Sequence, residues 1–143
     1  MDLAAKKAQI EAIFDVFNRR AFDELDEIFH PDYVEHSPMG DVHGVPAFKD
    51  YVSGWIAAFP DGRFAVSNVV VEDDMAAWQV RFRGTNTGSL MGMPPTGKSV
   101  DVPGVQMGRL SDDGRPIEHW NGNDMLILMQ QLGLIPDMQP SPA

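Results

Sequence analysis

The first sixty residues carry apolar side chains at the three- and four-residue spacing of amphipathic helices. Asp2 precedes the first of these patterns and is a residue type that caps helices well. The apolar positions of this pattern are Leu3, Ile10, Ile13, Phe14 and Phe17. The spacing predicts a helix that begins after Asp2 and continues through Phe17.

Two further helices are expected in this part of the chain, over residues 22–29 and 46–59. The first of them turns Leu25 and Ile28 inward and ends at a His-Pro pair, because the residue before a proline disfavours helix. The second begins with Pro46, which suits a first helical turn. Residues 33–36 read as a short extended segment, and residues 37–44 as a loop punctuated by proline and glycine.

From residue 64 onward the apolar period changes from that of helices to the alternation of strands. Trp78, Val80 and Phe82 alternate with polar residues, and an Asp-Asp-Gly turn separates the last two apolar segments. The expected strands cover residues 64–72, 75–87, 100–110 and 116–121. A short helix over 125–132 follows, and the proline-rich residues 136–143 are expected to form a loose tail.

Helices come first and strands afterwards, with hairpin-length turns between the strands. This order predicts an α+β fold in which three N-terminal helices pack on a strongly curved, mainly antiparallel sheet. Such a sheet forms a cone with an internal pocket that can hold a small ligand. The length of 143 residues suits one domain over 1–143.

Composition and charge narrow the classes of partner. The 21 acidic and 11 basic residues give a formal net charge of −10, which repels nucleic acid phosphates and anionic lipid. No apolar run approaches the ~18 residues of a membrane span, and no signal segment is recognisable, so a cytoplasmic protein is expected. The absence of cysteine excludes disulfides, thiolate metal sites and a cysteine nucleophile. Two histidines and a carboxylate can hold a metal, but no sequence spacing brings such a set together, so no metal site is expected.

Five segments resemble one known family in order and spacing. They are Phe-His-Pro-Asp-Tyr-Val at 29–34, Gly-Thr-Asn-Thr-Gly at 84–88, Met-Gly-Met-Pro-Pro-Thr-Gly-Lys at 91–98, Glu-His-Trp at 118–120 and Gln-Gln-Leu-Gly at 130–133. With these segments the chain, from about residue 10 to 135, resembles the SnoaL-like polyketide cyclases, also called ester cyclases, of the nuclear-transport-factor-2-like superfamily. The resemblance implies ring closure by an intramolecular aldol reaction in which an Asp removes a proton next to a carbonyl, with no metal and no cofactor. It also implies a hydrophobic substrate, polyketide-like or an ester, and a homodimer.

The chain departs from the aldol cyclases at two positions. The resemblance places Asn121 where those enzymes have their Asp, and Gln106 where they have an assisting His. Neither residue can accept a proton, but both can orient or polarise a carbonyl. Asp124 matches an Asp that recurs widely in the family.

Three residues are therefore candidates for acid–base catalysis: His119, His36 and Asp124. His119 shares a strand face with Asn121 and could act as the base, or it could be a structural histidine held by a carboxylate. The segment around His36 is similar, more weakly, to the base-bearing segment of ketosteroid isomerases, and His36 could instead cap a turn. Asp124 and Glu118 are the only acids near the end of the last strand. Asp124 could be a general acid or the cap of the last helix.

The aromatic residues of the predicted helices form the core, and some of them are expected to line the pocket. The candidates for substrate contact are Phe14, Phe17, Trp55, Phe59, Asn121 and Gln106. The sequence thus predicts an enzyme that acts on a small hydrophobic carbonyl compound. A non-catalytic binding protein of the same fold and a ketosteroid-isomerase-like isomerase are the alternatives. The outer face of the sheet, with Trp120 and the polar residues at 79, 81 and 83, is expected to form the dimer contact.

Overall fold

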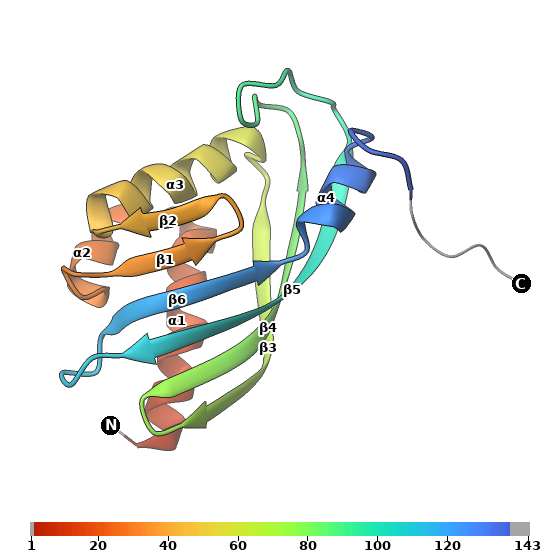
Figure 1. Ribbon diagram of the computed structural model, residues 1–143. Helices are drawn as coiled ribbons and strands as arrows, with labels where there is room; N and C mark the ends of the chain where they lie inside the picture. The colour runs from red at the N-terminus through yellow and green to blue at the C-terminus, as the bar shows by residue number, and fades with distance from the viewer. Residues whose placement is uncertain (1, 138–143) are drawn as a thin grey trace, which may run out of the picture.

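A curved, open six-stranded sheet wraps around two long helices in the computed structural model, which describes residues 2–137 (Figure 1). The strand order is β2-β1-β6-β5-β4-β3. All neighbouring strands are antiparallel except β1 and β6, which run parallel. The predicted α+β class and mainly antiparallel sheet are therefore confirmed. The expectation of a loose tail falls mostly on residues 138–143, outside the described residues.

The helices follow the predicted pattern closely. The Asp2 carboxylate accepts a hydrogen bond from the Ala5 amide (2.8 Å) and so caps α1 (Leu3–Arg19). The segment predicted as one helix over 22–29 is a 3₁₀ turn, η1 (Phe22–Glu24), followed by the short α2 (Leu25–Ile28). Pro46 lies in the first turn of α3 (Val45–Ala58), as predicted. The last helix, α4, spans Met125–Gln131.

The four long strands form an antiparallel meander: β3 (Arg63–Glu72), β4 (Met75–Thr85), β5 (Ser99–Leu110) and β6 (Pro116–Asn123). The last of them is longer than predicted, because pairing with β5 continues through the register pair of Gly104 and Asn123. The sequence had suggested an end at Asn121, since Asn-Gly-Asn is typical of a turn.

The prediction of a loop over residues 37–44 is wrong in part. The structure forms a hairpin here, in which β1 (Val34–Ser37) pairs with β2 (Gly40–His43). Most of β2 is exposed to solvent, so it shows no apolar alternation that could signal a strand. Its pairing with β1 is what identifies this segment as a strand. Gly44, with a φ of 85°, then turns the chain into α3, a backbone conformation that suits glycine.

The core consists of two clusters of buried side chains. The larger is rich in aromatic side chains from α1, α3 and the sheet, including Phe14, Phe48 and Trp78. The smaller contains Phe59 and Phe82 together with side chains of α4. Members of both clusters border a cavity between the helices and the sheet. No helix within residues 2–137 is long and apolar enough to cross a membrane.

Candidate functional site

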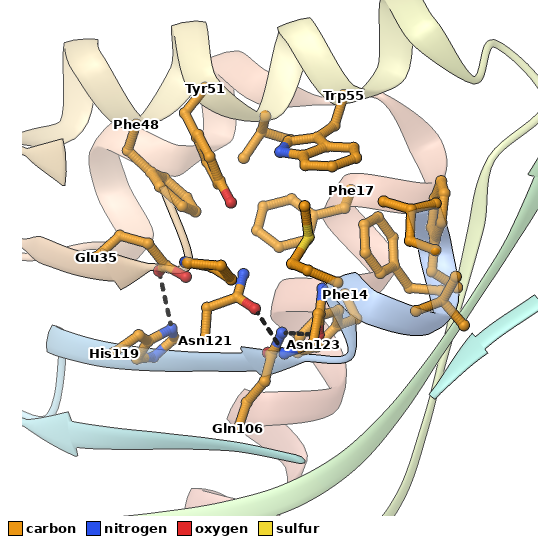
Figure 2. Close-up of a pocket in the computed structure, with 17 residues that line it drawn as sticks. Phe14, Phe17, Glu35, Phe48, Tyr51, Trp55, Gln106, His119, Asn121 and Asn123 are labelled. Atoms are coloured by element: carbon orange, nitrogen blue, oxygen red, sulfur yellow. Dashed lines mark hydrogen bonds and ion pairs between the residues drawn. The ribbon is translucent and has the colours of Figure 1, made fainter. Parts of the chain in front are cut away.

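The cavity has an aromatic wall and a polar wall (Figure 2). It contains about 790 Å³ of space between atoms, including the part that opens to solvent. The side chains from α1 and α3 that line it are Phe14, Phe17, Phe48, Tyr51, Val52 and Trp55. The polar wall consists of Glu35, Gln106, His119, Asn121 and Asn123. Phe14, Phe17 and Trp55 thus lie where the sequence predicted them.

The polar wall follows from the geometry of three neighbouring strands. Alternation along β6 turns His119, Asn121 and Asn123 to the concave face, as predicted for the first two. The parallel neighbour β1 places Glu35 in register with His119. The antiparallel neighbour β5 places Gln106 opposite Asn121. Five polar side chains therefore meet inside a mostly apolar cavity, which is the arrangement of a small-molecule site.

Among residues 2–137, Glu35 is the only acidic residue on this wall, and it is 4% exposed. The Tyr33 hydroxyl donates a hydrogen bond to it, and the Asn121 side chain hydrogen-bonds it as well. Burial raises the pKa of the Glu35 carboxyl above its ordinary value, although both hydrogen bonds and the nearby His36 act in the opposite direction. A cavity carboxyl whose pKa is raised towards neutrality is a strong candidate for a general base.

His119 lies beside Glu35, and the two form an ion pair only if the imidazole is protonated (Figure 2). The distance from His119 Nδ1 to Glu35 Oε2 is 3.9 Å, longer than a hydrogen bond. The rings of Tyr33 and Trp78 pack edge-on against the imidazole, each with centroids 5.3 Å away. Burial lowers the pKa of His119 to about 3, so the imidazole is neutral at physiological pH. An imidazole of such low basicity accepts a proton less readily than Glu35 does.

His36 lies on the opposite face of the sheet and does not line the cavity. Its Nδ1 contacts Asp41 Oδ1 (2.8 Å), its Nε2 contacts Glu118 Oε2 (2.7 Å), and its ring stacks on Trp120. Hydrogen bonds to Glu118 and Asp41 raise the pKa of His36. The geometry therefore separates His36 from any ligand in the cavity, contrary to its expected place at the pocket.

Asp124 is the N-cap of α4, and its carboxylate accepts a hydrogen bond from the Ile127 amide (3.0 Å). It borders a shallow recess on the outer surface together with Pro103 and Gly104, outside the cavity. The capping interpretation is thus the one that the geometry supports.

Phe59 was expected among the pocket residues, and this is wrong. It is 0% exposed and is absent from the cavity lining. Its ring stacks on Trp55 and packs edge-on against Phe82 within the smaller core cluster.

The sequence interpretation missed several residues of the site, among them the polar Glu35, Tyr51 and Asn123 and the apolar Phe48 and Val52. Figure 2 shows the Tyr51 hydroxyl pointing from α3 into the cavity, towards the polar wall. The prediction that Asp124 and Glu118 were the only acids near the end of β6 overlooked Glu35, which arrives from the neighbouring strand. Strand alternation from His36 was the available signal, but it required knowing which face of β1 is buried. Within residues 2–137, no cluster of three or more His, Asp or Glu side chains is placed to hold a metal ion.

Comparisons with known proteins agree on the family. Residues 8–132 match the family model described as SnoaL-like polyketide cyclase. Nogalonic acid methyl ester cyclase from Streptomyces nogalater is 31% identical over 122 residues, covering 82% of this chain and 89% of that protein. The structure of AclR from Streptomyces galilaeus, a proposed hydroxylase, superposes with a TM-score of 0.83 at 29% identity, over 96% of this chain and 87% of that one. A proposed SnoaL-like polyketide cyclase from Jannaschia sp. CCS1 gives a TM-score of 0.81 at 29% identity, over 92% and 93% of the two chains.

Proposed function

The chain belongs to the SnoaL-like polyketide cyclase family, and we propose that it is an enzyme that closes a ring in a hydrophobic, polyketide-like carbonyl compound or its ester, with Glu35 as the base. The observation that supports this proposal most directly is the Glu35 carboxyl, which is buried at the cavity wall and hydrogen-bonded by Tyr33 and Asn121. A fold shared by proteins named as a cyclase and a hydroxylase does not by itself fix the chemistry, so the proposal rests on this site.

The proposed reaction needs one group that takes a proton and returns it. The Glu35 carboxylate removes a proton from the carbon next to a substrate carbonyl, and the resulting enolate carbon attacks a second carbonyl carbon of the same molecule. One carbon–carbon bond forms, the attacked carbonyl becomes an alkoxide, and the protonated Glu35 returns the proton to that oxygen. The step is balanced with Glu35 alone, and it requires no cofactor. A dry cavity strengthens each electrostatic contact along this path.

Asn121 takes a different role from the Asp that the aldol cyclases are expected to have at this position. Its Oδ1 accepts a hydrogen bond from the Asn123 backbone amide (3.0 Å), so its amino group is the end that faces Glu35. Asn121 is therefore a positioning residue that holds the base. The catalytic carboxyl has moved from β6 to the adjacent strand β1, and the cavity still contains one acid–base group.

The aromatic wall supports a flat, hydrophobic substrate. Phe14, Phe48 and Trp55 offer faces and edges against which an aromatic or polyene ring system can stack. The name of the Streptomyces nogalater relative, a methyl ester cyclase, supports an ester substrate. No Lys or Arg within residues 2–137 lines the cavity, which disfavours a substrate that carries a carboxylate.

Two alternative functions share the same cavity. A ketosteroid-isomerase-like enzyme would use Glu35 to move a proton between two carbons without forming a ring. A binding protein would hold the ligand and leave its protons in place, an interpretation that Asn121 and Gln106 favour because neither can accept a proton.

Hydrogen–deuterium exchange separates the enzyme from the binding protein. 2-Tetralone is a flat, apolar ketone with acidic protons next to its carbonyl, and their exchange in D₂O is followed by NMR. The wild-type protein is expected to accelerate exchange, and Glu35→Gln is expected to abolish the acceleration. Glu118→Gln is the matched control, because Glu118 lies on the outer face of the neighbouring strand. Binding of 2-tetralone without any acceleration of exchange would favour the binding protein. Ring closure of nogalonic acid methyl ester then distinguishes a cyclase from an isomerase. It is detected by chromatography as a product of unchanged mass and altered retention time.

A further inference from the structure

Two side chains of the polar wall, Gln106 and Asn123, form a chain of hydrogen bonds of fixed direction with Trp78, which does not line the cavity. Trp78 Nε1 donates to Gln106 Oε1 (3.2 Å), and Gln106 Nε2 donates to Asn123 Oδ1 (2.9 Å). Trp78 is 1% exposed and Gln106 is 7% exposed, so the first two members of this chain are shielded from water, whereas Asn123 is half-buried. An indole nitrogen can only donate. The Gln106 carbonyl must therefore face Trp78, and the Gln106 amino group must face Asn123.

This direction determines how the Asn123 amide is oriented. Because its oxygen accepts from Gln106, its amino group points away from Gln106. Among residues 2–137, no protein group accepts a hydrogen bond from Asn123 Nδ2. Asn123 also lines the cavity, on the same face of β6 as Asn121 (Figure 2). The Asn123 amino group is thus a hydrogen-bond donor without a protein acceptor, and it is available to a ligand in the cavity.

The backbone opposite Asn123 is shaped to accommodate this orientation. A Cβ atom at Gly104, its register partner on β5, would lie 2.5 Å from Asn123 Oδ1. The same Cβ would lie 2.9 Å from Asn123 Cα and 3.2 Å from the Gly122 backbone oxygen, so any other residue here would require a shift of the Asn123 side chain or of the strand that carries it. Glycine at 104 therefore allows the amide to lie flat against β5, with its oxygen against Gln106.

We propose that the Asn123 side-chain amino group binds the carbonyl oxygen of the substrate and stabilises the negative charge that gathers there when Glu35 removes the adjacent proton. The stabilisation of negative charge rests on the proposed function. The binding of the carbonyl oxygen does not, because recognition of a carbonyl needs no catalysis. Trp78 and Gln106 are positioning residues that act through Asn123. The site selects ligands whose oxygen accepts a hydrogen bond, and it disfavours hydrocarbons of the same shape.

The proposed carbonyl unit lies between the base and the donor. Glu35 is in register with His119, and position 123 lies two strand repeats further along β6, about 13 Å between Cα atoms, so the two side chains must reach towards each other along the polar wall. Asn121 holds the Glu35 carboxylate, and Asn123 holds the donor. In the proposal, a C–H bond of the substrate is directed at Glu35 and the oxygen of the attached carbonyl at Asn123. Removing a single donor to a developing oxyanion typically lowers kcat by about 10²–10³-fold.

A matched ligand pair tests the recognition directly. 2-Tetralone and tetralin have nearly the same shape, but only the ketone has an oxygen. Titration calorimetry is expected to show tighter binding of 2-tetralone by wild-type protein, by about 3- to 10-fold for one hydrogen bond. The carbonyl infrared band of the bound ketone is expected at lower frequency than in hexane. Asn123→Leu should bind both ligands equally and lose the infrared shift, and Trp78→Phe should weaken the preference by freeing the Gln106 amide to rotate.

A second variant reverses the polarity of the site and keeps the test sharp if Asn123→Leu does not fold. Asn123→Asp retains an acceptor for Gln106 but places an oxygen where the amino group was. It should lose the preference for 2-tetralone and gain one for the alcohol 2-tetralol, which can donate. An unchanged ketone preference and infrared band in these variants, or no preference in the wild type, would overturn the inference. If Glu35→Gln leaves deuterium exchange unaltered while Asn123→Leu abolishes the ketone preference, the carbonyl site stands and the proposed base is wrong.

Discussion

Glu35 and His119 occupy register positions on two parallel strands, with 3.9 Å between Oε2 and Nδ1, and burial moves their pKa values in opposite directions. Removal from water disfavours the charged form of each group, which raises the pKa of the acid and lowers that of the imidazole. Two groups that could have formed an ion pair instead favour their neutral forms. This makes Glu35 a better base than an ordinary carboxylate and removes His119 from acid–base chemistry near neutrality.

Replacement of the buried carboxyl should separate activity from stability. Glu35→Gln is expected to lower proton-transfer activity by about 10²–10⁴-fold, the usual contribution of a general base. Because the folded-state pKa of Glu35 is raised, its ionisation costs stability as pH rises through that value. The variant should therefore melt higher than wild type by roughly 2–6 °C at pH 8, and by less at pH 5. Differential scanning calorimetry of both proteins, with Glu118→Gln as the outer-face control, checks this; a lower Tm for Glu35→Gln at pH 8 would contradict it.

The Tyr33 hydroxyl should set the acid limb of the pH–rate profile. Its hydrogen bond stabilises the charged form of Glu35 and so lowers the pKa of that carboxyl. Tyr33→Phe removes the bond and should raise the pKa further, which moves the acid limb of kcat/KM to higher pH. Tyr51→Phe is the matched control, since Tyr51 is not among the groups that hydrogen-bond Glu35. A shift towards lower pH in Tyr33→Phe would show that another group controls this limb.

His119 should make the protein acid-labile. The folded state keeps the imidazole neutral with a pKa of about 3, whereas the unfolded chain protonates it with a pKa near 6.5. Below pH 6.5 the unfolded state binds one more proton, so stability falls with decreasing pH by about 1.4 kcal/mol per unit until the folded-state pKa is reached. Urea titrations of wild type and His119→Gln between pH 7 and 4 measure this slope. The prediction fails if the two proteins lose stability in parallel.

Asp124 should contribute to stability rather than catalysis. Its carboxylate caps α4 from outside the cavity. Asp124→Ala is therefore expected to lower the free energy of unfolding by about 0.5–2 kcal/mol with little change in the rate of proton exchange. Asp124→Asn, which retains a capping oxygen, should recover most of the loss. Abolished activity at an unchanged Tm would instead make Asp124 a catalytic acid.

The outer face of the sheet is expected to form a homodimer contact. Val105 and Met107 on β5 are 58% and 41% exposed, and Trp120 lies in register beside Met107 on β6. Exposed apolar side chains gathered on one sheet face are typical of an interface. Sedimentation velocity at micromolar concentration should show a dimer, and Val105→Lys should shift it to monomer. A wild-type monomer under these conditions would refute the expectation.

Much of the fold follows from local pattern. The apolar spacing of α1 and α3 and the capping residues Asp2 and Pro46 lie within single helices, so the sequence alone predicts them. Alternation along one strand likewise placed His119 and Asn121 on a common face. Each of these inferences needs only neighbours in the chain, because helix and strand periods are properties of the backbone.

The polar wall could not be predicted in the same way. Glu35 reaches the cavity only because β1 pairs in parallel with β6, more than eighty residues further along the chain. A strand of four residues, Val34–Ser37, does not reveal which of its faces is buried, and His36 was as plausible as Glu35. Asn123 faces the cavity because pairing with β5 extends β6 beyond an Asn-Gly sequence that locally favours a turn. The sequence by itself determined the two long helices, the four long strands and the acidic, cysteine-free character of the chain. Tertiary structure decided which carboxyl is buried and which amide is oriented, because desolvation and hydrogen-bond direction depend on residues that only the folded sheet brings together.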